Sequence, residues 1–231
     1  MSEPSTERGP VRKKRGGRCE GCGLHLHLCL CAEFPKVRMA AKLMVVQHIG
    51  ERFKPTNTGR LLARMVNDAS LTFFGMREPP FDTTAFEQSD VVWHNIFPRD
   101  GAPVLNAAQL AAMQTEAGED RRLGFVVLDG TWHQCSRMSR RVPKVKDLPC
   151  IALPDGPPSR WGVRTQHDVR GLSTFEAGIR LVSLLEGPEV AKPLQTIFHE
   201  IAARLLFMKG KLRQPEVPAQ WRTDVLPELA G

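Results

Sequence analysis

Four cysteines close to the amino terminus constrain this 231-residue chain more than any other feature. Cys19, Cys22, Cys29 and Cys31 form a C-x2-C-x6-C-x-C pattern, so four of the six cysteines fall within 13 residues. Four thiolates at such spacing suit one tetrahedral Zn²⁺ without an open coordination position, which defines a structural rather than a catalytic site. We therefore expect these four side chains to bind zinc, with iron as the alternative metal.

Two disulfides are the other interpretation of these cysteines. Residues 1–18 are polar and cationic and contain no apolar core of a secretory signal. This favours a reducing cytosol, where clustered cysteines more often bind metal than form disulfides. His25 and His27 could replace a thiolate, but with four cysteines present we expect them at the surface or at a substrate. The remaining Cys135 and Cys150 are expected to be small buried hydrophobes.

The charge of the chain points to a polyanionic partner. Its 32 basic and 25 acidic residues give a net charge of +7 and a pI of about 9.3. Such a surplus favours RNA, DNA or an anionic membrane surface. No apolar run reaches the length that spans a bilayer, so we expect no membrane insertion and a cytoplasmic location.

Composition divides the chain into three parts. Residues 1–18 are predicted to be a disordered basic tail, either a phosphate-binding arm or a solvated tail. Residues 19–34 form a small cysteine module that is too short for a core of its own and is expected to depend on its metal. Residues 35–231 are predicted to form the one large domain.

The large domain alternates short apolar runs with amphipathic segments. This alternation predicts an α/β fold with a mostly parallel sheet covered by helices on both faces. Strands are expected at 42–48, 71–74, 91–97, 124–128 and 150–153, and helices at 57–69, 106–117, 131–141, 173–186 and 193–209.

The clearest candidate site follows the strand at 124–128. Ligands of parallel sheets bind beyond the carboxyl ends of the strands, and Asp129 stands at that point. Gly130 lets the backbone approach a ligand, Thr131 can cap the next helix, and Trp132 offers an aromatic face. A helix cap beside a buried tryptophan is the structural alternative.

A second candidate is the start of the helix at 173–186. Ser173 and Glu176 are three residues apart and can form a reciprocal capping box. The same free N–H groups at a helix start favour a carboxylate or a phosphate. The sequence leaves both interpretations open.

Two polar loops carry many basic residues. The loop at 48–60 (HIGERFKPTNTGR) follows the first strand and is a candidate pocket wall. The loop at 160–170 (RWGVRTQHDVR) interleaves arginines with an aromatic residue, which suits phosphate binding and base stacking. Solvent-exposed loops are the alternative for both.

These motifs together resemble the DTW-domain family. Residues 129–132 (DGTW) look like its signature, and 173–177 (STFEA) look like its S-T-x-E-A motif. The cysteine cluster, 56–59 (TNTG) and the arginines before Leu172 fit the same pattern in the same order, so the resemblance covers roughly residues 19–210. The chain departs from that pattern at two positions outside the proposed chemistry, which are Ile49, where the family often has Pro, and Cys135, where it often has Ala.

The resemblance implies a tRNA-uridine aminocarboxypropyltransferase as the catalytic domain at 35–231. Such enzymes transfer the 3-amino-3-carboxypropyl group of S-adenosylmethionine to N3 of a tRNA uridine and release methylthioadenosine. The resemblance also implies a SPOUT-like fold with a carboxyl-terminal knot. A SPOUT-like methyltransferase that acts on RNA and a non-catalytic zinc-bearing RNA-binding protein are the alternatives. We expect tRNA and S-adenosylmethionine as partners and a monomeric protein.

Site roles follow from the resemblance. Asp129 is expected to be the base or to orient the uridine, and Trp132 to stack on a base. The expected catalytic residues are Asp129, Thr131 and Trp132; the expected cofactor-binding residues are Leu128, Gly130, Leu172, Ser173, Thr174 and Glu176; and the expected RNA-binding residues are Arg52, Lys54, Arg60, Arg164 and Arg170.

Overall fold

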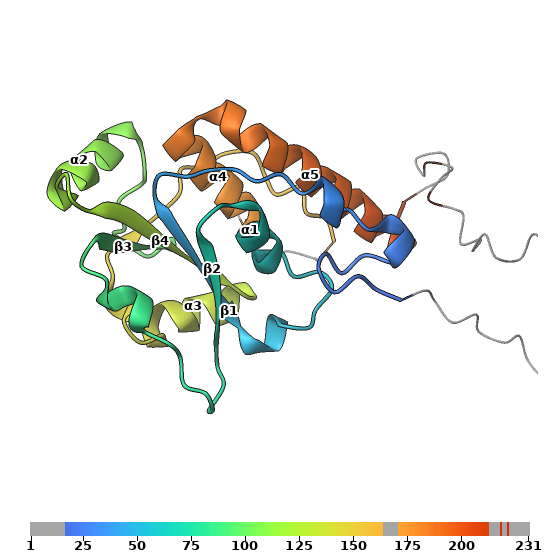
Figure 1. Cartoon of the computed structure of the whole chain (residues 1–231), viewed down its shortest axis with the longest axis horizontal. Coiled ribbons are helices and arrows are strands. Elements are labelled where there is room, and N and C mark those ends of the chain that lie inside the picture. Colours follow the sequence, from blue (N-terminus) through green and yellow to red (C-terminus); the bar gives the residue numbers. More distant parts are fainter. Residues whose placement is uncertain (1–16, 164–170, 213–217, 219–220, 222–231) are drawn as a thin grey trace, which may run out of the picture.

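Five parallel strands form one sheet in the order β2-β1-β4-β3-β5 (Figure 1). The computed structural model describes residues 17–163, 171–212, 218 and 221. The parallel sheet with its helices confirms the predicted α/β class. The strands are β1 (Lys42–His48), β2 (Ala69–Phe74), β3 (Val91–Ile96), β4 (Arg122–Asp129) and β5 (Cys150–Ile151).

Helices cover both faces of the sheet. One hydrophobic core packs β1 and β4 against α1, α2, α4 and α5, and a smaller core packs the opposite face against α3 (Figure 1). The helices are α1 (Gly59–Met65), α2 (Ala107–Ala117), α3 (Trp132–Arg141), α4 (Thr174–Glu186) and α5 (Pro188–Met208). Short 3-10 turns are η1 (Leu26–Leu28), η2 (Cys31–Glu33), η3 (Ile49–Glu51), η4 (Thr84–Glu87) and η5 (Val145–Asp147).

The central strands are apolar on both faces because both faces are buried. Phe125 and Val127 of β4 enter the larger core, while Val126 and Leu128 enter the core under α3. Successive side chains of a strand alternate between faces. This alternation assigns Asp129 to the same face as Val127, where α1 and α4 lie.

Two helix boundaries differ from the sequence prediction by four residues or more. α1 ends at Met65 rather than at residue 69, and the backbone of Asp68 turns to a φ of 58°, which no helix continues through. α5 begins at Pro188 rather than at Pro193. Proline is favoured in the first helical turn, so Pro188 starts the helix and Pro193 is tolerated inside it.

The cysteine module packs onto the large domain. Leu24, Leu28 and Leu30 are at most 1% exposed and belong to the core that contains α1, α4 and α5. Arg204 of α5 donates a hydrogen bond from Nη1 to the carbonyl oxygen of Leu28 at 2.9 Å. The buried leucines between the cysteines therefore extend the main core rather than form a separate one.

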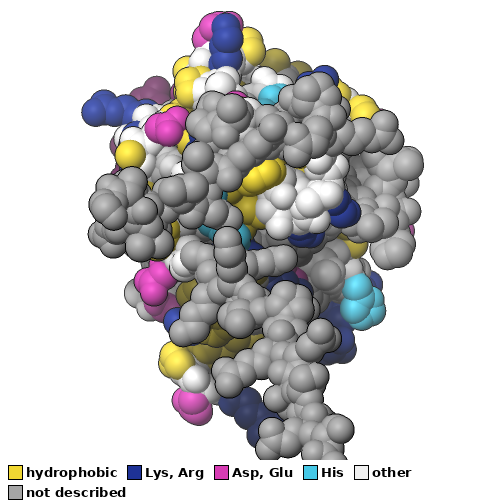
Figure 2. Space-filling view, turned by 90° about the vertical axis from the view of Figure 1, so that its right-hand side faces the viewer, with side chains coloured by type: hydrophobic (Ala, Val, Ile, Leu, Met, Phe, Trp, Pro, Cys, Tyr) yellow, Lys and Arg dark blue, Asp and Glu magenta, His cyan; other side chains and the backbone are white. Residues whose placement is uncertain are grey.

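Some sequence predictions concern residues that the structure does not describe. The basic tail lies almost entirely there, and so do residues 164–170 of the predicted basic loop at 160–170. Within the described residues, no helix is both long and apolar enough to cross a membrane. On the face of the molecule seen in Figure 2, basic and acidic side chains are interspersed over the described surface.

Candidate functional site

Four chain segments converge on the carboxylate of Asp129 at the end of β4. This side chain is buried, with 3% exposure. Gln47 Nε2 donates a hydrogen bond to Oδ2 at 2.7 Å, and Asn57 Nδ2 donates to the same oxygen. Thr174 Oγ1 donates to Oδ1 at 2.6 Å. We call Gln47, Asn57, Asp129 and Thr174 the Asp129 cluster.

Strand register and close packing build this cluster. Gln47 lies directly opposite Asp129 in the parallel β1–β4 pair. Gly59, the first residue of α1, approaches the carboxylate so closely that a Cβ there would lie 2.5 Å from Asp129 Cγ. Only a residue without a side chain fits at that distance, so Gly59 lets α1 start against the carboxylate.

The donors around Asp129 are an amide of glutamine, an amide of asparagine and a hydroxyl. An ionised carboxylate can only accept hydrogen bonds, and a buried one needs donors to replace water. These three neutral groups supply those donors. Both carboxylate oxygens already accept hydrogen bonds from these donors. A substrate proton would therefore have to share an oxygen with one of the donors or displace it. The geometry therefore favours Asp129 as the residue that holds β1, α1, β4 and α4 together at the sheet edge.

The first turn of α3 follows Asp129 directly. Thr131 and Gln134 form a reciprocal capping box, which confirms the predicted helix cap. Gln134 Nε2 also lies 3.1 Å from Nδ1 of His48, which accepts a hydrogen bond from the Gly50 N–H at 3.1 Å. Trp132 is 42% exposed, so the alternative of a buried tryptophan is wrong.

The capping-box interpretation of α4 is confirmed. Ser173 Oγ accepts from the N–H of Glu176, and Glu176 Oε2 accepts from the N–H of Ser173 at 2.8 Å. The same Oε2 accepts from Ser159 Oγ at 2.7 Å, and Oε1 accepts from the N–H of Arg160 at 2.7 Å. Glu176 therefore fastens the loop after β5 to the start of α4.

The other predicted cofactor contacts lie around this edge. Leu128 is buried in the core under α3, whereas Gly130 and Leu172 are half-buried. Arg164 and Arg170, two predicted RNA contacts, lie outside the described residues.

The loop after β1 carries further predicted RNA contacts and one exposed aromatic ring. The guanidinium of Arg52 lies 4.9 Å from the ring centre of Phe73 and 5.2 Å from that of Phe53. Phe53 is 84% exposed. Lys54 Nζ pairs with Oε1 of the fully buried Glu51 at 2.5 Å. This loop leaves β1 at the sheet edge that holds Asp129.

The four amino-terminal cysteines form a second polar centre, which we call the cysteine cluster. Their sulfurs lie within 4.8 Å of one another, with separations of 3.4 Å for Cys19–Cys29, 3.6 Å for Cys19–Cys31 and 3.8 Å for Cys22–Cys29. A tetrahedral Zn²⁺ with bonds of about 2.3 Å sets its sulfurs about 3.8 Å apart, whereas a disulfide needs about 2.05 Å. All six cysteines of the chain are free, so the disulfide interpretation is wrong and the cluster fits a metal ion.

The surroundings of the cysteine cluster shift the pKa values of Cys19 and Cys22 in opposite directions. The backbone N–H of Cys22 lowers the pKa of the Cys19 thiol to about 6, while burial raises the pKa of Cys22 to about 12. A metal binds thiolates, so its binding would displace the remaining protons. Outside the cluster, Cys135 is buried as predicted and burial raises its pKa, whereas Cys150 is only half-buried.

Sequence reasoning missed Gln47 and the role of Gln134. Gln47 is 1% exposed inside an otherwise apolar strand, and a polar residue in such a run is the signal that could have identified it. Gln134 joins α3 to His48, and only the fold brings these two residues together.

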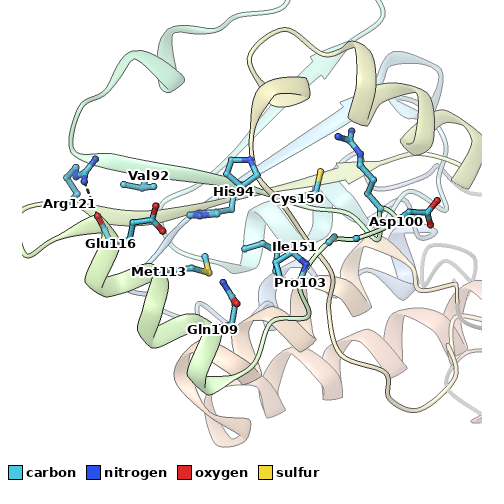
Figure 3. Close-up of a pocket in the computed structure, with 14 residues that line it drawn as sticks. Val92, His94, Asp100, Pro103, Gln109, Met113, Glu116, Arg121, Cys150 and Ile151 are labelled. Carbon is cyan, nitrogen blue, oxygen red and sulfur yellow. Dashed lines mark hydrogen bonds between the residues drawn. The ribbon is translucent and has the colours of Figure 1, made fainter.

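A cavity of about 600 Å³ lies apart from both clusters, between β3, β5 and α2 (Figure 3). His94, Met113 and Cys150 line it together with Glu116 and Gln109. Burial lowers the pKa of His94. None of the site residues predicted from the sequence lines this cavity.

The fold and the two centres define a class of protein. It is a parallel α/β domain with a polar cluster at the carboxyl ends of its strands and a four-cysteine cluster that could hold a metal ion. The chain belongs to the DTW domain family, whose model matches residues 16–206.

One curated relative is tRNA-uridine aminocarboxypropyltransferase 2 of Macaca fascicularis. It is 25% identical over 179 residues, which make up 75% of this chain and 58% of the relative. The chain thus spans less than two thirds of that protein's length. No solved structure matches the chain.

Proposed function

We propose that this protein is a tRNA-uridine aminocarboxypropyltransferase. It transfers the 3-amino-3-carboxypropyl group of S-adenosylmethionine to N3 of a tRNA uridine. The new carbon–nitrogen bond replaces the carbon–sulfur bond, methylthioadenosine leaves as a neutral thioether, and the N3 proton passes to solvent. When bound, S-adenosylmethionine supplies the electrophilic carbon beside its sulfonium.

One observation carries the proposal. The aspartate of the DTW signature and the threonine of the S-T-x-E-A motif are 45 residues apart, yet Thr174 Oγ1 donates directly to Asp129 at 2.6 Å. The contact lies at the carboxyl ends of parallel strands, where ligands of open α/β sheets bind. Membership of the DTW family and the name of the relative support the same activity.

In this proposal Asp129 acts mainly through position. Its three hydrogen bonds fix Thr174 at the start of α4 and Asn57 ahead of α1. The positive end of the α4 helix dipole favours the carboxylate of the amino-acid chain beside the capping box. Placement decides which carbon next to the sulfonium meets the uridine, so a rigid edge would serve to present the aminocarboxypropyl carbon to N3.

Exposed aromatic side chains at the same edge suit an RNA substrate. N3 lies on the pairing edge of uridine, so the target base must be unpaired or extruded. Phe53 lies in the loop that follows β1 and is 84% exposed, and Trp132 lies just after β4 and is 42% exposed. We propose that these rings stack on bases while Arg52 and Lys54 meet phosphates.

We propose that the metal of the cysteine cluster is structural zinc. Four thiolates fill a tetrahedral shell and leave no position for a substrate. Zinc would therefore hold the cysteine module in shape and take no part in the transfer.

The full chain, S-adenosylmethionine and tRNA provide the test. We expect chromatography to detect methylthioadenosine and nucleoside mass spectrometry to detect aminocarboxypropyl-uridine. Adenosylhomocysteine together with a methylated nucleoside would replace the proposal with a methyltransferase. Binding of tRNA without any binding of S-adenosylmethionine by calorimetry would replace it with a non-catalytic RNA-binding protein.

A further inference from the structure

Two arginines of α1 reach from one face of the helix to the cysteine module. Arg64 Nη1 lies 3.3 Å from Cys31 Sγ, and Arg60 Nη1 donates to the carbonyl oxygen of Glu20 at 3.4 Å. Arg60 and Arg64 are four residues apart, so they share one face of the helix. The Arg64 guanidinium also lies 4.9 Å from the ring centre of Phe34, which follows the cysteines.

Two glycines beside the cysteines, Gly21 and Gly23, leave room for these two guanidinium groups. A Cβ at Gly21 would lie 2.3 Å from Arg64 Nη1 and 2.7 Å from Cys31 Sγ. A Cβ at Gly23 would lie 2.5 Å from Arg60 Nη2. Any larger residue at either glycine would displace an arginine from the cluster.

Arg60 has buried N–H groups that need a nearby anion. Its Nε and Nη2 are buried without a hydrogen-bond partner among the described residues. A desolvated cation is costly unless a negative charge faces it. Arg60 is therefore better placed to face the cysteine cluster than to contact tRNA phosphate.

Charge balance gives the same result. One Zn²⁺ with four thiolates carries a net charge of about −2. Two guanidinium groups supply the opposite charge, and Arg64 also offers an N–H to the Cys31 sulfur, which would be one of the metal ligands. Partners of this kind orient metal ligands and tune metal affinity.

The first turn of α1, which carries Arg60, also contacts the Asp129 cluster. The N–H of Arg60 donates to Asn57 Oδ1 at 3.1 Å, and Asn57 Nδ2 donates to Asp129. Gly59 packs against the same carboxylate. The two centres are thus joined by a helix of seven residues, which spans about 10 Å at about 1.5 Å per residue.

We propose that Arg60 and Arg64 neutralise the metal–thiolate cluster and thereby fix α1 against Asp129. They are positioning residues, because they act on the site through Asn57 and Gly59. The metal would then stabilise the transferase site without contacting any substrate. This inference rests on the proposed metal site and, for its consequence in catalysis, on the proposed function.

The first test measures metal retention by the full zinc-loaded chain. We expect Arg64→Gln and Arg60→Gln to lose zinc to a chromophoric chelator at about 10-fold to 100-fold lower chelator concentration than the parent. Arg64→Lys keeps the charge and should recover part of that loss. The matched control is Arg140→Gln, an exposed arginine of α3 that contacts Ser136. Retention equal to that control in both glutamine variants overturns the proposal.

The second test measures amide hydrogen exchange in α1. Chelation of the parent protein, and Arg64→Gln with its zinc retained, should both speed exchange of the hydrogen-bonded amides of Leu62 and Val66 while β4 stays protected. Unchanged exchange in α1 after metal removal overturns the link to Asp129. Neither measurement uses tRNA or S-adenosylmethionine, so a failure of the proposed transferase activity would leave both results interpretable.

Discussion

The cysteine cluster and the Asp129 cluster are held together in different ways. The four sulfurs are close in sequence, and Arg64 Nη1 lies within hydrogen-bond distance of one of them, Cys31 Sγ. The Asp129 carboxylate instead collects three neutral donors from distant segments. The first centre could hold an ion from outside the chain, whereas the second is complete from its own side chains.

This difference has a physical consequence. Four thiolates within 4.8 Å of one another would repel, so the thiolate form of the cysteine module that we propose would depend on a bound cation. The Asp129 cluster depends only on strand register and packing, which the sheet and α1 already supply. The two regions should therefore respond very differently to substitution, and the following variants test that expectation.

The largest effect on stability is expected for Cys22→Ser. Cys22 is fully buried and is one of the four proposed metal ligands, so its loss should release the metal and lower the free energy of unfolding by more than about 4 kcal/mol. Metal analysis and denaturant unfolding measure the two effects. Cys150→Ser is the matched control and should keep the metal. A metal-free Cys22→Ser protein with parental stability would contradict the dependence on an ion.

A smaller effect is expected for Asp129→Asn. The new amide can turn its oxygen toward Gln47 and Asn57 and its NH₂ toward the Thr174 hydroxyl, so the fold should persist at a cost of about 2 kcal/mol. Thermal unfolding measures this cost, with exposed Asp155→Asn as the control. Parental stability together with lost transferase activity would instead make Asp129 a group that acts on the substrate.

Thr174→Val should cost still less. It removes the hydroxyl that donates to Asp129 Oδ1 and keeps the shape, so we expect a loss of about 1 kcal/mol and a fall in kcat of about 10-fold. Thr174→Ser retains the hydroxyl and should restore both values. Denaturant unfolding and steady-state kinetics provide the measurements. Equal activity of the valine and serine variants would remove this hydrogen bond from the proposed site.

The contrast between a centre that is local in sequence and one assembled from distant segments also explains which features the sequence predicted. The cysteine cluster is local, so its spacing alone predicts a metal site. Asp129 was predicted because it follows a strand in a parallel fold, and the caps at Thr131 and Ser173 because capping boxes are local. Gln47 and the contact between Asn57 and Asp129 depend on strand register and on the start of α1, which no local pattern gives.

The packing of the cysteine module was equally hidden from the sequence. Its leucines look like part of a short loop, yet Leu24, Leu28 and Leu30 lie in the main core. The predicted start of α5 at Pro193 was also wrong. The helix starts at Pro188 and continues through a second proline, Pro193. In both cases tertiary packing overrides the local signal.

The smallest change in stability is expected for Phe53→Ala, which separates substrate binding from folding. Phe53 is 84% exposed, so its truncation should change stability by less than about 0.5 kcal/mol. Loss of one base-stacking contact of about 1 kcal/mol should weaken tRNA binding about 5-fold. Filter binding with the matched variant Leu26→Ala, which is also exposed but lies in the cysteine module, measures the difference. If the two variants bind tRNA equally well, the loop after β1 is not the surface that receives the base, and the exposed ring of Trp132 becomes the aromatic contact to test next.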